Sequence, residues 1–148
     1  MHTLSSSSAS RPAAAATEVQ RVAVAGATGF TGQELLRLLA RHPAVALTAA
    51  MSSGSTSASS RRLPALAHIW DGNITPLSSD ALRDANLVFL ALPDAAAAEL
   101  APSLVDAGVR VIDLSGAFRL REPDRRARWY PDTHRVPEAL AYGRPEAP

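Results

Sequence analysis

Short apolar runs recur along the chain in the way expected of strands in a buried sheet. Each run is followed by glycine, proline or serine. The runs are residues 20–25, 45–51, 87–92 and 109–115. Near-continuous apolar strands of this kind are typical of a parallel sheet that is covered on both faces.

Between these runs, other stretches have the features of helices. They are residues 30–41, a short stretch with Ser79 or Asp80 as its N-cap, and an alanine-rich stretch that opens at Pro93-Asp94 and continues to about Ala107 before Gly108. Strands alternating with helices predict an α/β fold, with a Rossmann-like, doubly wound and mostly parallel sheet. Residues 63–78 follow neither pattern and predict no element.

The two ends of the chain differ from this alternating core. Residues 1–18 are rich in serine and alanine, which predicts a disordered tail, with an organelle-targeting signal as the alternative. Residues 121–148 are rich in proline and charge and have weak periodicity. We therefore predict a nucleotide-binding domain over residues 19–120 and a connecting segment over 121–148.

Composition narrows the classes of function. Of the 148 residues 47% are hydrophobic, the net charge is +1 and there is no cysteine. A balanced charge argues against a nucleic-acid partner, and no stretch is apolar enough to predict a membrane span, so we expect a cytoplasmic protein. His68 and His134 have no partner at metal-ligand spacing, so no metal site is predicted.

Three glycines follow the first predicted strand at intervals of three, at positions 26, 29 and 32. A glycine-rich turn between a strand and a helix lets a pyrophosphate approach the backbone, and the helix N-terminus favours negative charge. Gly26, Gly29 and Gly32 therefore predict a nucleotide site. The alternative is a turn whose glycines serve only close helix–strand packing.

The end of the second predicted strand indicates which nucleotide. An NAD site usually carries an acid there for the ribose 2′-hydroxyl, but residues 45–60 contain none. The residues that could instead contact a 2′-phosphate are Ser52, Ser53, Ser55 and either Arg61 or Arg62. We therefore predict NADP(H) as the cofactor. The alternative is that these are solvated loop residues in a site that prefers neither NADP nor NAD.

A second candidate site follows the strand at 109–115. Ligands of doubly wound sheets bind beyond the carboxyl ends of the strands, where Ser115, Gly116 and Arg119 could contact a phosphate or carboxylate. The alternative is a structural role for these residues, in which Asp113 is a capping residue, Ser115 and Gly116 form a turn, and Arg119 is solvated.

Four stretches then carry a resemblance to a known family. In order they are VAVAGATGFTGQELLRLLARHP, LVFLALPDAAA, VIDLSGAFRL and YGRPE. From about Arg21 to Glu146 the chain resembles the N-terminal part of the N-acetyl-γ-glutamyl-phosphate reductases, which belong to the semialdehyde dehydrogenase superfamily. DLSGAFR followed by YG-x-PE favours this family over the aspartate-semialdehyde dehydrogenases, which remain an alternative, as does a non-catalytic nucleotide-binding module.

The resemblance implies roles for particular residues. It places the cofactor pyrophosphate against Gly26, Thr28, Gly29, Phe30, Thr31 and Gly32. It places the 2′-phosphate beside Ser52, Ser53 and Ser55, the cofactor along Leu92 and Pro93, and the substrate near Ser115, Gly116 and Arg119. Asp94-Ala95 stands where the family commonly has His-Gly, and Arg144 stands where it commonly has Leu.

The resemblance also implies a reaction. In this family a cysteine thiolate attacks the acyl phosphate, and NADPH reduces the thioester to an aldehyde in arginine biosynthesis. The family cysteine and histidine correspond to positions beyond Pro148, so we expect these residues to bind nucleotide without catalysing the reaction. A full-length enzyme would take a small-molecule substrate and form a homo-oligomer.

Overall fold

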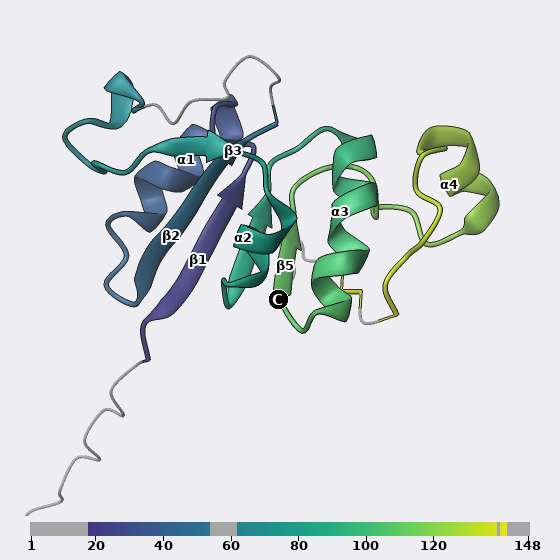
Figure 1. Ribbon diagram of the computed structural model, residues 1–148. Helices are drawn as coiled ribbons and strands as arrows, with labels where there is room; N and C mark the ends of the chain where they lie inside the picture. Colours follow the sequence, from purple (N-terminus) through teal and green to yellow (C-terminus); the bar gives the residue numbers. More distant parts are fainter. Residues whose placement is uncertain (1–17, 54–61, 139, 142–148) are drawn as a thin grey trace, which may run out of the picture.

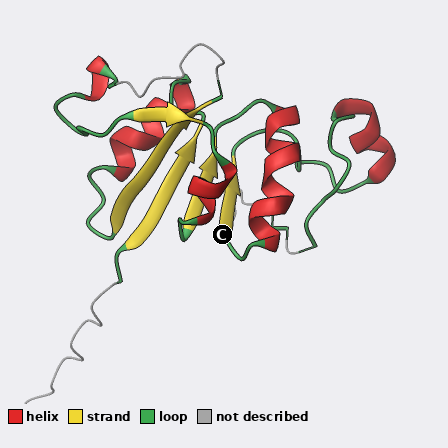
Figure 2. Cartoon of the chain, viewed as in Figure 1, coloured by secondary structure: helices red, strands yellow, loops and turns green. Residues whose placement is uncertain are grey.

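The computed structural model describes residues 18–53, 62–138 and 140–141. The strands are β1 (Gln20–Ala25), β2 (Val45–Ser52), β3 (Ile74–Pro76), β4 (Leu87–Leu90) and β5 (Arg110–Asp113). The helices are α1 (Phe30–Leu39), the 3₁₀ turn η1 (Pro64–Leu66), α2 (Ser79–Arg83), α3 (Asp94–Asp106) and α4 (Pro123–Trp129). Figure 2 shows strands alternating with helices over most of the described chain.

The five strands form one parallel sheet in the order β3-β2-β1-β4-β5 (Figure 1). The central strand β1 is buried on both faces, and its residues from Val22 to Ala25 have no exposed surface. Burial on both faces therefore explains the run of apolar residues in β1, because each side chain from Val22 to Ala25 packs against a helix or a neighbouring strand.

Helices cover both faces of the sheet (Figure 1). Val24 packs with Leu36 of α1 on one face, whereas Ala23 and Ala25 join the core with α2 and α3 on the other. Successive side chains of a strand point to opposite faces, so one strand contributes to both layers. The predicted doubly wound α/β fold is confirmed.

Several predicted bounds change in detail. α1 ends at Leu39 instead of Arg41, and β4 ends at Leu90 instead of Leu92. The cap of α2 is Ser78, whose side chain accepts from the Ala81 amide at 3.4 Å, so the prediction of Ser79 or Asp80 is wrong. Gly108 follows α3 with φ of +80°, as the predicted helix stop requires.

Two regions contain elements that the sequence pattern did not predict. Residues 63–78 hold η1 and the edge strand β3, and the C-terminal segment holds α4. α4 has no buried residue and lies at the periphery beyond α3 (Figure 1). It therefore lacks the apolar stripe by which a helix is recognised in sequence. Within the described ranges, no helix has the length and apolar character needed to cross a membrane.

Candidate functional site

The strand order reverses beside β1, which pairs with β2 on one side and β4 on the other. In open α/β sheets this reversal opens a crevice at the carboxyl ends of the strands, where ligands bind. The turn after β1 stands at this point. Its Gly26 and Ala27 amides both donate to the Met51 carbonyl at 2.8 Å, which attaches the turn to the end of β2.

Packing constrains the three glycines at positions 26, 29 and 32 to different degrees. A Cβ atom at Gly26 would lie 2.1 Å from the Ala91 carbonyl oxygen, and Gly26 has φ of +88°. A Cβ at Gly32 would lie 2.1 Å from the Gly26 carbonyl oxygen. A Cβ at Gly29 would meet only that same oxygen, at an ordinary 3.6 Å. Packing therefore explains Gly26 and Gly32, while nothing among the described residues requires glycine at position 29.

The N-terminus of α1 is open to an anion. Gly29 is its N-cap and supplies no side-chain cap, and the first turn contains no acidic residue. Phe30 and Thr31 are exposed, with Phe30 at 97%. The first amides of a helix lack intrahelical acceptors and carry partial positive charge, so this end can bind a phosphate through its backbone.

The N-terminus of α3 differs, because it already holds a carboxylate. Asp94 is the first residue of α3, and its Oδ1 accepts from the Gly116 amide at 2.6 Å. The negative charge of Asp94 disfavours an anion there. Of these two helix ends at the carboxyl edge of the sheet, the end of α1 therefore suits a pyrophosphate better.

The end of β2 presents its serines in different ways. Ser52 is 9% exposed, and its hydroxyl lies 3.2 Å from that of Thr28 in the glycine turn. Ser53 and Arg62 are exposed. Ser55 and Arg61 lie outside the described residues, so their predicted roles are not placed. Of the predicted 2′-phosphate contacts that the structure describes, Ser53 and Arg62 are the accessible ones.

The turn after β4 lies directly against the glycine turn. Leu92 is buried, and its Cδ2 would be 3.3 Å from a Cβ at Gly26. Pro93 is exposed and forms the N-cap of α3. The side chain of Leu92 therefore packs against the glycine turn. Of the two residues, Pro93 is the one that a cofactor in the crevice could reach.

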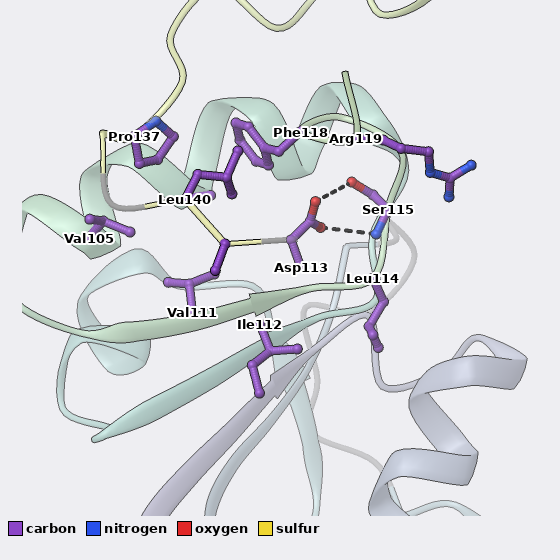
Figure 3. A pocket seen from close by; sticks show the side chains of 12 residues that line it. Val105, Val111, Ile112, Asp113, Leu114, Ser115, Phe118, Arg119, Pro137 and Leu140 are labelled. Atoms are coloured by element: carbon purple, nitrogen blue, oxygen red, sulfur yellow. Dashed lines mark hydrogen bonds between the residues drawn. The ribbon is translucent and has the colours of Figure 1, made fainter. Parts of the chain in front are cut away.

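Internal hydrogen bonds organise the loop after β5 (Figure 3). The carboxylate of Asp113 accepts from the Ser115 amide at 3.0 Å and from its hydroxyl at 2.8 Å. The Ser115 hydroxyl oxygen in turn accepts from the Ala117 amide at 3.1 Å. A Cβ at Gly116 would lie 2.5 Å from the Tyr130 ring. Asp113 and Gly116 thus have structural roles, as one sequence interpretation expected.

Arg119 is the predicted substrate-side residue that is exposed. It lies at the edge of a cavity of about 570 Å³ between α3, β5 and the segment near residue 140 (Figure 3). Apolar side chains dominate the wall, among them Val105, Val111, Phe118 and Leu140, while Ser115 and Asp113 contribute polar groups. The predicted site residues therefore form two groups, one around the glycine turn and one beside β5, linked through the bond between Asp94 and Gly116.

Clear pKa shifts occur away from both groups, at exposed ion pairs. The Arg37 guanidinium hydrogen-bonds to Glu34 on α1 at 2.7 Å and lowers the pKa of that carboxyl. Arg135 lowers the pKa of Asp106 in the same way. Among the residues that the structure describes, no group of acidic, histidine or cysteine side chains could hold a metal ion.

Two residues of the site were missed at the sequence level. Asp94 was predicted to open a helix and was noted as a departure from a family pattern, but it was not predicted as a site residue, yet it joins α3 to the loop after β5. Its position at the start of a long helix was the available signal. Tyr130, whose ring lies against Gly116, stands in a segment whose weak periodicity gave no signal.

Comparison with known proteins gives one consistent result at the sequence level. Residues 21–147 match the family model described as "Semialdehyde dehydrogenase, NAD binding domain". The chain is 43% identical over 130 residues to an N-acetyl-gamma-glutamyl-phosphate reductase of Halorhodospira halophila, and 42% identical to that of Aromatoleum aromaticum. Each match covers 85% of this chain and 38% of the relative, so the chain spans well under half of their length.

Solved structures share the fold. An aspartate semialdehyde dehydrogenase from Candida albicans, determined with NADP, is 22% identical with a TM-score of 0.58. That match covers 71% of this chain and 32% of the other. A probable aspartate-semialdehyde dehydrogenase from Pseudomonas aeruginosa is 25% identical with a TM-score of 0.55, over 72% and 30% of the two chains. The resemblance expected from the sequence is confirmed.

Proposed function

This chain belongs to the semialdehyde dehydrogenase family through its NAD-binding domain, and we propose that it is the NADP-binding part of an N-acetyl-γ-glutamyl-phosphate reductase. The observation that carries the proposal is the open turn at Gly29. Packing explains Gly26 and Gly32, whereas a Cβ at Gly29, the N-cap of α1, would make only an ordinary 3.6 Å contact with the Gly26 carbonyl oxygen. A pyrophosphate bound there would supply the missing reason for glycine.

The preference for NADP over NAD rests on the end of β2. Residues 45–60 include no acid that would repel a 2′-phosphate. Ser53 is an exposed residue just beyond β2, and Arg62 is an exposed cation before η1. A serine hydroxyl and a guanidinium are suitable donors to a phosphate. Ser55 and Arg61 are further candidates.

The reductase assignment rests on the relatives of similar sequence. The curated relatives named above are N-acetyl-gamma-glutamyl-phosphate reductases at 42–43% identity. We extend their activity to the full-length enzyme: NADPH-dependent reduction of N-acetyl-glutamyl phosphate, in the cytoplasm, by a homo-oligomer. The 148 residues include no cysteine, so the thiolate that this reaction requires would come from outside them.

Within this proposal the chain's own residues bind the cofactor and orient the substrate. The α1 amides would hold the pyrophosphate and Pro93 would lie along the cofactor, which supplies a hydride when bound. Arg119 would face the substrate's anionic groups, because its guanidinium is exposed at the edge of the cavity beside β5. The bond between Asp94 and Gly116 would fix the loop carrying Arg119 relative to Pro93.

Isothermal titration of the 148-residue chain with NADPH and with NADH tests the cofactor assignment. We expect NADPH to bind about ten- to a hundredfold more tightly, because a hydrogen-bonded phosphate contact contributes roughly 1.5–3 kcal/mol. An Arg62→Gln variant would reduce the preference if that guanidinium contributes. Equal or tighter binding of NADH would refute the NADP assignment.

A further inference from the structure

The glycine turn and the end of β2 are joined by side chains as well as by backbone. The hydroxyl oxygens of Thr28 and Ser52 lie 3.2 Å apart, and either can donate to the other. The two residues are 24 positions apart in sequence. Their contact bridges the segment expected to hold the pyrophosphate and the strand end expected to hold the ribose.

The surroundings of Ser52 make it unsuited to hold a ligand directly. Ser52 is 9% exposed, while Ser53, the next residue, is exposed. The Ser52 carbonyl accepts from the Leu77 amide at 3.1 Å, which fixes the backbone at this position against the chain after β3. The hydroxyl of Ser52 contacts Thr28 of the glycine turn, whereas the exposed Ser53 can meet a ligand.

Backbone hydrogen bonds also connect the glycine turn to β2, one residue before Thr28 and Ser52 in each segment. Gly26 and Ala27 both donate to the Met51 carbonyl at 2.8 Å. These two bonds fix the beginning of the turn to β2. The Thr28–Ser52 contact extends the attachment by one residue along each segment, toward the sites where the ligand would lie.

From this geometry we propose that Thr28 and Ser52 form a positioning pair that sets the distance between the pyrophosphate turn and Ser53, and that this distance determines the preference for a 2′-phosphate. The proposal rests on the proposed function, since it presupposes a dinucleotide in the crevice. Thr28 and Ser52 act through Ser53 and do not themselves need to touch the 2′-phosphate. A ligand without that phosphate makes no 2′-phosphate contact at Ser53 and is therefore less sensitive to the pair.

The test compares NADPH and NADH affinities, by isothermal titration, in the wild-type chain and in Thr28→Val, Ser52→Ala and the double variant. Thr28→Val keeps the β-branched shape and removes the hydroxyl. We expect each single variant to lower the NADPH-to-NADH affinity ratio about three- to tenfold, the range of a single hydrogen bond. For the affinity ratio, the double variant should lose no more than either single variant, because each single variant already removes the Thr28–Ser52 contact.

Thr28→Ser is the matched control, because it retains the hydroxyl and should keep the wild-type ratio. It also separates a positioning role from simple destabilisation if Thr28→Val folds poorly. Circular dichroism and urea unfolding of each variant verify the fold.

Three outcomes would overturn the proposal. Equal loss of NADPH and NADH affinity in Thr28→Val would assign the hydroxyl to the pyrophosphate itself. Additive effects in the double variant would show two independent contacts. An unchanged ratio in both single variants would show that the pair has no role in selection. Wild-type protein that binds neither cofactor, or both equally, would instead refute the proposed function, so the two failures are distinguishable.

Discussion

Asp94 and Gly116, which are 22 residues apart in sequence, are joined by a 2.6 Å hydrogen bond from the Gly116 amide to the Asp94 carboxylate. This bond links the first residue of α3 to the loop after β5. Gly116 is buried and Asp94 is exposed, so the bond is partly buried. The bond thus connects the proposed cofactor side of the sheet edge to the proposed substrate side.

Removal of this acceptor should destabilise the fold. We expect Asp94→Ala to lower the free energy of unfolding by about 1–2 kcal/mol, because it removes the acceptor of the Gly116 amide and a charge at a helix N-terminus. Asp94→Asn keeps an acceptor oxygen and should lose clearly less. Urea unfolding measures both variants, and equal losses would show that charge alone, not the hydrogen bond, stabilises this loop.

The cap of α2 provides a second test. Ser78 accepts from the Ala81 amide, so Ser78→Ala should cost about 1 kcal/mol of stability. Ser79→Ala is the matched control, since it removes a hydroxyl one residue later, inside the helix. Thermal unfolding distinguishes the two variants, and a larger loss in Ser79→Ala would contradict the cap assignment.

The ion pair between Asp106 and Arg135 should show a pH dependence. Its hydrogen bond holds the pKa of Asp106 below the usual value of 3.8. A lowered folded-state pKa means that the pair stabilises the protein above the unfolded pKa and that this contribution disappears as pH falls through the folded pKa. Carboxyl NMR titration should therefore give a higher pKa for Asp106 in Arg135→Gln than in wild type. Identical titration curves would show that Arg135 does not engage Asp106 in solution.

How far the sequence predicts this molecule depends on burial. The bounds of β1 are predicted correctly, because every residue from Val22 to Ala25 is enclosed and a buried strand must be apolar throughout. α4 is missed because none of its residues is buried, and β3 is missed because it has only three residues and ends at Pro76. An element that buries little surface leaves little pattern in its sequence.

In the candidate site, the sequence located residues but did not distinguish their roles. Glycine spacing located the turn, but only the positions of the Ala91 and Gly26 carbonyl oxygens separate the packing glycines from Gly29. Likewise Ser52 and Ser53 look alike in sequence, whereas the contact with Thr28 and the burial of Ser52 give them different surroundings. Such distinctions depend on neighbours that are distant in sequence.

The proposed function predicts that the 148 residues alone do not catalyse the reductase reaction. No cysteine is present, and a serine hydroxyl is hardly ionised near neutral pH without an adjacent base. Incubation with N-acetylglutamate semialdehyde, phosphate and NADP should therefore produce no NADPH absorbance above a blank without enzyme. Turnover by material whose mass matches residues 1–148 would contradict the thioester mechanism for this protein.

The most direct test of the account is NADPH binding by Gly29→Val, measured by isothermal titration. A Cβ at position 29 would lie at an ordinary 3.6 Å from the Gly26 carbonyl oxygen, so the variant should fold, but its side chain would occupy the space where the pyrophosphate would approach the α1 amides. Gly108→Ala is the control for backbone strain alone. Its Cβ would meet nothing within 4 Å, but the φ of +80° disfavours a side chain, and the position lies between the end of α3 and the start of β5. We predict that folded Gly29→Val loses at least about thirtyfold in NADPH affinity, equivalent to two or more hydrogen bonds, while Gly108→Ala binds like wild type. Wild-type NADPH affinity in a folded Gly29→Val variant would contradict the assignment of this turn as the cofactor site.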